Sequence, residues 1–431
     1  MPWAVCAALI GNAFVQHATW RWCYYIGIIY SAIALIGTAI VYFPPSRPQQ
    51  DYEVSRWDEL KSLDWAGLAL YTGGLTVLLI GLTWAGSAEH PWKGTSVIAP
   101  IVIGAAALIA CFAYDFTICK HAFLPLDLFR RVKEFTVLLV LVFVSGMVYY
   151  SMAGLLPQGT LYVYSNDPIQ IGLIQLPNGI AQLIGACILP AISHKIKHLK
   201  LQVIIAMTVQ TLFVALYSVA MPHRKATWMA LQFFGQGCFG YITLLCYFIA
   251  SLHVPLRELG IATGLIGTFR SAGGSVGNAI FNTILSSTVN DKLGPNIAAA
   301  AIAAGFPAVE LELLIPAVIK NSLGIPGAFA TLPDASLAVQ AVTSEAFKQT
   351  YAYAFRRVFW ATIPFGVLAV IASFYIKDAS QYLTNHTAVH LERDATMHVR
   401  HRDKGHVERV EQSRVVAPQG SALSAENNHI L

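Results

Sequence analysis

One arginine stands among glycine, small and apolar residues in the stretch "GTFRSAGGSVGNAIF", which begins at Gly267. A charge at the centre of a bilayer costs roughly 2.5 to 3.5 kcal/mol on insertion scales, so Arg270 is expected to face protein or water. Residues that recur every four positions predict a polar stripe on one helix: Arg270, Gly274, Asn278 and Asn282. Gly273 and Gly277 form the small-xxx-small pattern of a close helix contact. The stripe indicates either a functional cavity or gate, or helix packing in which Arg270 caps neighbouring carbonyl groups.

Two other apolar runs carry polar residues at helical spacing. The run that contains Pro177 has Gln175, Asn178, Gln182 and Gly185. The run that contains Trp228 has Gln232, Gln236 and Gly240. Three polar faces predict a shared interior, and the alternative is hydrogen bonding between helices without ligand contact.

Aromatic and amide groups also gather near Pro157, where Tyr149, Tyr150 and Gln158 suit an uncharged, partly apolar ligand. Each tyrosine has packing as its alternative role. The candidate substrate-binding residues are therefore Tyr149, Tyr150, Gln158, Gln175, Asn178, Gln182, Gln232, Gln236, Arg270 and Asn278.

The sequence lacks the motifs of several kinds of chemistry. There is no phosphate-binding G-x-x-x-x-G-K-[ST] sequence. His194 and His198 are four residues apart, but they stand among lysines without an adjacent glutamate, which is typical of a solvated basic loop rather than a metal site. No Ser/His/Asp or paired-carboxylate arrangement stands out, so we expect no enzyme, no metal and no cofactor.

The composition is that of a membrane protein, because 56% of the 431 residues are hydrophobic and only 12% are charged. A bilayer core about 30 Å thick needs roughly 20 apolar residues of helix to cross it. Isolated strands cannot satisfy their backbone in lipid, so an all-α fold is predicted. The predicted spans are Cys23 to Phe43, Trp65 to Gly86, Ser96 to Ala113, Phe135 to Pro157, Ile169 to Ile192, Gln202 to Met221, Thr227 to Leu252, Gly260 to Leu285 and Val358 to Ile376. The run Met1 to Gln16 is apolar but short, and predicts the end of a partial span.

Apart from Arg270, the basic residues lie in connections and in the C-terminal tail, so the net charge of +5 favours membrane orientation over nucleic-acid binding. If residues 44–64 are cytoplasmic, alternation places 18 Lys and Arg residues on that side and nine on the other. The short loop with Lys195, Lys197 and Lys200 lies on the predicted cytoplasmic side. The tail is predicted to be cytoplasmic too.

Three segments outside the spans have distinct compositions. Residues 44–64 are proline-rich and then mixed in charge, as expected of a cytoplasmic linker. Residues 286–357 form a predicted extracellular loop, in which an alanine-rich run and "VELELLIPAVIKN" predict interfacial helices. Residues 377–431 are polar, lack apolar periodicity and are predicted to be disordered.

Several runs resemble the major facilitator superfamily, most closely its fourteen-span drug:proton antiporter branch with the fungal trichothecene efflux pumps and their siderophore-transporter relatives. They are "TWRWCYYIGIIYSAIALIGTAIVYFPP", "LDWAGLALYTGGLTVLLIGLTWAGSAEHPW", "FLPLDLFR", "GLIQLPNGIAQLIGA" and "ELGIATGLIGTFRSAGGSVGNAIF".

The resemblance implies two six-helix bundles, an extra pair of spans between them, and alternating access around a central cavity. It assigns residues 1–43 to a remnant of the N-terminal bundle, 65–116 to the extra pair and 117–376 to the C-terminal bundle. The expected fold is therefore an incomplete major facilitator fold of about nine full spans and a partial N-terminal one. The family's first four spans and most of the fifth are not present in this alignment.

The activity that the resemblance implies is export of hydrophobic small molecules, such as toxins or drugs, by proton antiport across the plasma membrane. Its expected partners are such a substrate, protons as the coupling ion and the lipid bilayer, with no nucleic acid. The loop "AISHKIKHLK" has His194 and Lys195 where the family has an acid and an arginine. The nearest carboxylate to the spans is Asp115, so coupling is expected in the part that the alignment lacks. The alternatives are a siderophore transporter and a non-transporting membrane fragment or interaction partner.

Overall fold

The computed structural model describes residues 2–43, 63–85, 93–117, 126–255, 258–307, 310–325, 327–330 and 335–380, together with positions 57, 61, 90, 91 and 332. Every regular element in this part of the chain is helical. The α-helices are α1 (Pro2–His17), α2 (Arg21–Val41), α4 (Trp65–Trp84), α5 (Thr95–Thr117), α6 (Leu126–Arg130), α7 (Val137–Gly159), α8 (Pro168–Leu183), α9 (Leu189–Ile196), α10 (Leu199–Ala220), α11 (Lys225–His253), α12 (Leu259–Ala303), α13 (Leu311–Ser322) and α14 (Leu337–Ser373). Three π-helical turns join or precede them: η1 (Val132–Thr136), η2 (Thr160–Tyr164) and η3 (Ile184–Ile188).

Capping side chains fix where several of these helices begin. Asp64 accepts a hydrogen bond from Gly67 N (2.7 Å) at the start of α4, and Asp167 accepts one from Ile169 N (3.2 Å) at the start of α8. Ser336 does the same for Val339 N (3.3 Å) at α14. These bonds satisfy backbone donors that the first helical turn leaves unpaired.

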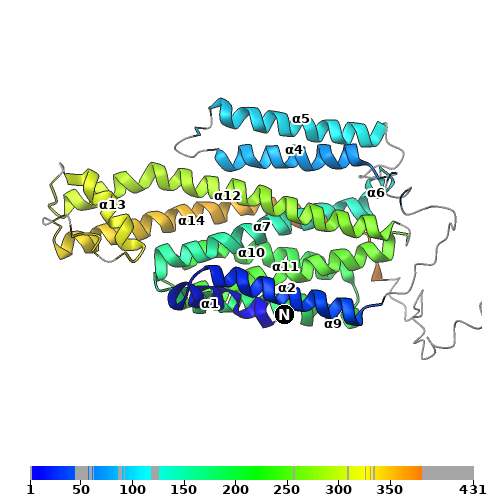
Figure 1. The fold of residues 1–431 in the computed structure, drawn as a ribbon, viewed down its shortest axis with the longest axis horizontal. Helices are drawn as coiled ribbons and strands as arrows, with labels where there is room; N and C mark the ends of the chain where they lie inside the picture. The colour runs from blue at the N-terminus through cyan, green and yellow to red at the C-terminus, as the bar shows by residue number, and fades with distance from the viewer. Residues whose placement is uncertain are drawn as a thin grey trace, which may run out of the picture. The chain divides into compact units, whose positions relative to one another are not determined.

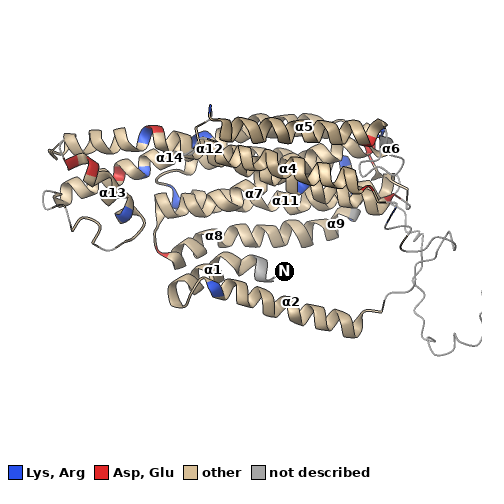
Figure 2. Ribbon diagram, turned by 45° about the horizontal axis from the view of Figure 1, so that its top comes forward, with Lys and Arg blue, Asp and Glu red and all other residues tan. Residues whose placement is uncertain are grey.

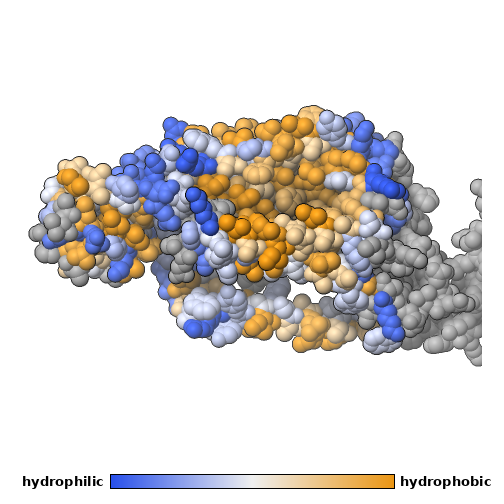
Figure 3. Space-filling view, turned by 90° about the horizontal axis from the view of Figure 1, so that it is seen from above, coloured by the Kyte–Doolittle hydropathy of each residue, from blue (hydrophilic) through white to orange (hydrophobic). Residues whose placement is uncertain are grey.

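Within the described residues, eight helical segments are long and apolar enough to cross a membrane. They confirm the all-α membrane fold and account for eight of the nine predicted spans. The ninth, Gly260 to Leu285, lies in α12, which has the length but is less apolar because of its small and polar residues. Figure 2 places most described charges near the helix ends or beyond them, and Figure 3 shows an apolar surface between hydrophilic margins.

The structure differs from the prediction in residues 286–357. The alanine-rich run is not a separate helix, because α12 continues to Ala303 without a break, and α14 already begins at Leu337. The run "VELELLIPAVIKN" does contain a separate helix, α13. With α13 they form a helical extension, made of residues 286–303, α13 and residues 337–357 (Figure 1). The alanine-rich run of α12 has high helix propensity, so the helix carries on past Pro295 after the apolar span ends. The extension has an apolar core in which Leu293, Leu314 and Phe347 are buried.

Six helices form the main bundle: α7, α8, α10, α11, α12 and α14 (Figure 1). The longest interfaces join α12 to α7 and α14, and α10 to α11 and α14. The helices α4 and α5 pair with each other, and α4 also contacts α12.

The helix α1 packs along α8, and α2 contacts α1. A Cβ atom at Gly179 of α8 would overlap the backbone of Val5, and one at Gly172 would lie 2.7 Å from Cα of Leu9. The two glycines therefore permit a close crossing of α1 and α8, as small residues do in membrane helices.

The predicted linker 44–64 lies largely outside the described residues, as does the predicted disordered tail beyond Ser380. The first residues of that tail do contact the bundle. Lys377 forms an ion pair with Glu134 (2.7 Å), and Ser380 Oγ accepts a hydrogen bond from Leu199 N (2.9 Å).

Candidate functional site

Polar side chains divide the apolar core of the bundle into two clusters. One cluster, with Leu138, Ile249 and Ile266, fills the end where α7 and α12 begin. The other, with Leu155, Trp228 and Phe281, fills the opposite end and continues into the helical extension. Between them, in sequence order along α7, α8, α10, α11 and α12, lies a polar layer: Ser145, Tyr149, Gln182, Gln210, Gln232, Gln236 and Arg270. The layer therefore lies at the level where a transporter fold holds its substrate.

Arg270 lies near the middle of the apolar span of α12, eleven residues after its start, or roughly 16 Å along the helix. Its side chain crosses α7 at Gly146, where an added Cβ would be 3.2 Å from Arg270 Cγ. The atom Nε of Arg270 is buried and has no hydrogen-bond partner among the described residues. A guanidinium held in this way is available to a ligand or to a residue of another chain segment.

Close packing of α12 on α7 holds Arg270 at this position. A Cβ atom at Gly273 would overlap the carbonyl oxygen of Phe143, and one at Gly277 would lie 2.5 Å from Met147 O. The predicted small-xxx-small contact of α12 is therefore present, with α7 as its partner.

An aromatic cluster lies beside Arg270. The side chain of Arg270 lies near the hydroxyl of Tyr149 on α7. The rings of Tyr149 and Phe239, the latter on α11, stack with centroids 3.8 Å apart, and Tyr150 meets Phe239 edge-on at 5.5 Å. Tyr150 is half-exposed and contacts the Gly274 position. The cluster offers flat apolar faces next to a cation.

The α8 side of the site is an amide pair. Gln182 donates from Nε2 to Asn178 Oδ1 at 3.2 Å, and its side chain lies beside the hydroxyl of Tyr149. Asn178, Gln182, Tyr149 and Arg270 are thus neighbouring polar side chains on α8, α7 and α12. Four candidate residues from three helices come together here.

Gln232 and Gln236 lie deeper, on α11, and both are completely buried. Their amide nitrogen and oxygen atoms make no side-chain hydrogen bond of standard geometry among the described residues, although the hydroxyl of Tyr217 lies close to Gln236. Burying an unpaired amide group costs about 1–3 kcal/mol, so these side chains favour occupancy of the layer by water or a polar ligand group.

Gln175 has a different environment from its neighbours on α8. It donates to Thr160 Oγ1 at 3.0 Å, and the indole nitrogen of Trp228 donates to the same oxygen at 3.2 Å. All three side chains are buried, so Gln175 joins α8 to η2 and Trp228 joins α11 to the same threonine.

Two further candidates lie away from Arg270. Gln158 is exposed near the end of α7. Asn278 is exposed and lines a groove of about 620 Å³ between α12 and α4, where it accepts a hydrogen bond from Asn282 Nδ2 (2.6 Å). A four-residue spacing advances about 40° around a helix at each step, so the stripe turns from α7 at Arg270 toward α4 at Asn278.

Sequence reasoning missed Ser145, Gln210 and Phe239. Ser145 donates to Gln210 Oε1 at 2.8 Å and joins α7 to α10 within the polar layer. These two residues stand singly in apolar runs, without the helical spacing that marked the others. Phe239 belongs to an apolar run in which nothing separates a binding aromatic residue from a core one.

A bundle of membrane-length helices with a polar layer near mid-depth is the architecture of a secondary transporter. A family profile described as "Fungal trichothecene efflux pump (TRI12)" matches residues 3–412. The "MFS-type transporter prx5" of Penicillium rubens is 30% identical over 377 residues, which are 86% of this chain and 67% of that protein. The "Trichothecene efflux pump TRI12" of Fusarium sporotrichioides is 24% identical over 88% of this chain and 63% of its own length. The "Efflux pump FUS6" of Gibberella fujikuroi is 30% identical over 67% of this chain and 51% of its own length.

The chain belongs to the fungal trichothecene efflux pump family, which consists of transporters and not enzymes. The predicted resemblance to the major facilitator superfamily is thereby confirmed. The chain spans from about half to two thirds of the length of these relatives.

Proposed function

We propose that the protein acts in efflux of hydrophobic small molecules, toxins or drugs, across the plasma membrane by proton antiport. The observation that carries the proposal is the site formed by Arg270, Tyr149 and Gln182, which places a cation and amide groups next to stacked rings near mid-depth. The names of the relatives as efflux pumps support the direction of transport.

Each part of the site has a role in this proposal. The rings of Tyr149, Tyr150 and Phe239 contact the apolar part of the substrate, while Gln182, Gln232 and Gln236 offer donors and acceptors to its polar groups. Arg270 orients the substrate with a planar set of donors or closes the path as a gate. The helices α7, α8, α10 and α11 contain neither Asp nor Glu, so we assign proton coupling to residues outside these four helices.

The proposal keeps the domain boundaries predicted from the sequence. Residues 1–43 belong to the N-terminal bundle, residues 65–116 form the extra pair of spans, and residues 117–376 form the C-terminal bundle. In that arrangement the polar layer faces the N-terminal bundle across the substrate path.

The test measures cellular accumulation of a fluorescent hydrophobic substrate in a fungal host, with and without a protonophore. The chain is expressed alone and joined to the preceding spans of the Penicillium rubens relative. We expect energy-dependent efflux from the joined form, lost in Arg270→Ala and partly retained in Arg270→Lys, at unchanged membrane abundance. Arg130→Ala, which removes an exposed cation near the end of the bundle, is the matched control and should retain efflux.

Two outcomes would decide against the proposal. Normal abundance without any efflux would favour the non-transporting alternative. Uptake of a ferric siderophore by the joined form, with no export of hydrophobic dyes, would favour siderophore transport. Wild-type efflux by Arg270→Ala would remove Arg270 from the site and leave it a packing role.

A further inference from the structure

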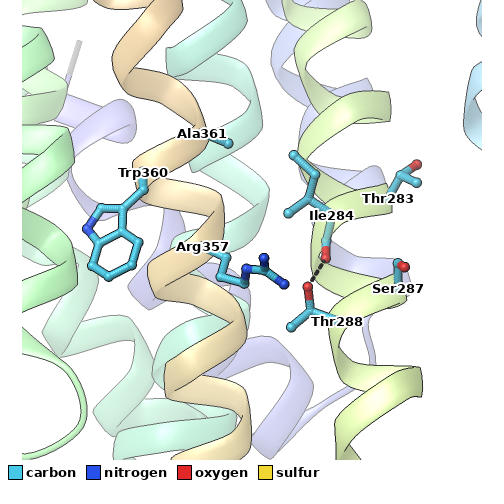
Figure 4. Close-up of a pocket in the computed structure, with 7 residues that line it drawn as sticks. All are labelled: Thr283, Ile284, Ser287, Thr288, Arg357, Trp360 and Ala361. Atoms are coloured by element: carbon cyan, nitrogen blue, oxygen red, sulfur yellow. Dashed lines mark hydrogen bonds between the residues drawn. The ribbon is translucent and has the colours of Figure 1, made fainter.

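A groove of about 510 Å³ opens between α12 and α14, on the surface of the bundle where the helical extension begins. Figure 4 shows Arg357 reaching from α14 toward Thr288 on α12, with Ile284 one turn away. The hydroxyl of Thr288 donates to Ile284 O (2.7 Å). The guanidinium group of Arg357 thus lies between the two helices and does not point directly away from them.

A second cation lies one turn farther out. Lys292 Nζ and Arg357 Cζ each lie 5.9 Å from the centroid of the Tyr353 ring. Among the described residues, neither cation has an ion-pair or hydrogen-bond partner. The adjacent Arg356 is engaged elsewhere, because its Nε donates to Ser218 O at 3.1 Å. Two cations without an ion-pair partner in the described part of the chain therefore lie next to one ring: Arg357 lines the groove, and Lys292 lies one turn of α12 beyond its lining.

Arg357 lies near the expected depth of a lipid phosphate group, and Lys292 lies one helical turn farther out. Arg357 and Lys377 are about 20 residues apart on and just after α14, which is roughly 30 Å, the thickness of a hydrocarbon core. Lys377 forms its ion pair with Glu134 at the far boundary. Between them α14 exposes Trp360, Leu368 and Ile371, with exposed fractions of 55%, 62% and 51%. A tryptophan at this level is typical of a membrane interface.

We propose that this groove binds the phosphate of a membrane phospholipid. Arg357 and Lys292 hold the phosphate oxygens, and the acyl chains lie along the exposed apolar face of α14. Two cations exceed the single charge of a phosphodiester, so lipids with an additional negative charge bind more tightly. The bound lipid fastens the base of the helical extension to the bilayer through α12 and α14.

The test is a lipid titration of the purified 431-residue chain in detergent, followed by native mass spectrometry. The probe is dioleoyl phosphatidylserine. The double variant Lys292→Gln/Arg357→Gln is expected to bind the first lipid at least about tenfold more weakly than the wild type. The control Lys320→Gln/Lys348→Gln removes two exposed lysines of the extension that do not line the groove, and it should keep wild-type binding.

Two further arms separate the possible sources of binding. Dioleoylglycerol, which lacks the phosphate, is expected not to bind, and equal binding would show that only the acyl chains matter. Inorganic phosphate at millimolar concentration is expected not to compete, and full competition would show a free-anion site instead. Unchanged lipid binding by the groove variant, with the same unfolding temperature as the control, would also overturn the proposal.

Discussion

The rings of Tyr149 on α7 and Phe239 on α11 stack face to face: their centroids are 3.8 Å apart, and the angle between the ring planes is 2°. The stack joins two neighbouring helices of the bundle, close to Arg270. In the proposed function, a substrate would contact the free face or the edges of this stack.

Replacing Phe239 by leucine should separate this role from simple packing. Loss of the stack is expected to cost about 0.5–1.5 kcal/mol beyond the change in buried area. The unfolding temperature of the purified chain should fall by several degrees, and aromatic dyes should bind more weakly. Phe248→Leu, on the exposed side of the same helix, is the control. An equal effect of the two substitutions on both measurements would contradict the role of the stack.

The glycines of α12 provide a second, steric prediction. Gly273→Ala places a methyl group against the carbonyl oxygen of Phe143, so α7 and α12 must separate. We expect a loss of about 1–3 kcal/mol, as for overpacked cores. Gly264→Ala on the same helix meets nothing within 4 Å and should be neutral or slightly stabilising. Thermal unfolding in detergent compares the two variants, and equal unfolding temperatures would show that the helices can adjust.

The hydroxyl of Thr160 accepts from both Gln175 and Trp228, so its removal leaves two buried donors unpaired. Thr160→Val is nearly isosteric and is expected to destabilise the fold by about 1–3 kcal/mol. Thr160→Ser restores the oxygen without the methyl group and should recover most of this loss. If serine proves no better than valine in the same unfolding assay, the hydroxyl contributes nothing to stability.

The fold class could be predicted because the hydrophobic effect and backbone hydrogen bonding leave few choices for apolar runs of this length. The helix ends could not be predicted for α12 and α14. Their outer halves are polar enough to leave the membrane, and hydropathy detects the edge of the apolar run rather than the end of the helix.

The site was predictable in part. Helical spacing identified Arg270 and Gln182, and the aromatic and amide groups near Pro157 indicated Tyr149; the three side chains come together from three helices. Helical spacing also selected Gln175, whose side chain bonds to Thr160 and lies apart from Arg270. Spacing shows on which face of a helix a residue lies, but it does not show which residue it contacts on another element. Asn278 faces α4 instead of the polar layer, because residues at four-residue spacing move gradually around the helix. The sequence does not show where along such a stripe the residues stop facing the interior, since this depends on tertiary packing.

The orientation of the chain rests on charge bias and has a direct chemical test. Asn385-His386-Thr387 is a glycosylation sequon outside the described residues, in the tail that the bias places in the cytoplasm. Asn385 should therefore remain unmodified in a eukaryotic host. Leu323→Thr creates a second sequon at the exposed Asn321 on the helical extension, which the same orientation places outside, so this site should be glycosylated. Glycosidase treatment followed by mass measurement reads both sites, and modification of Asn385 together with an unmodified Asn321 would require the opposite orientation.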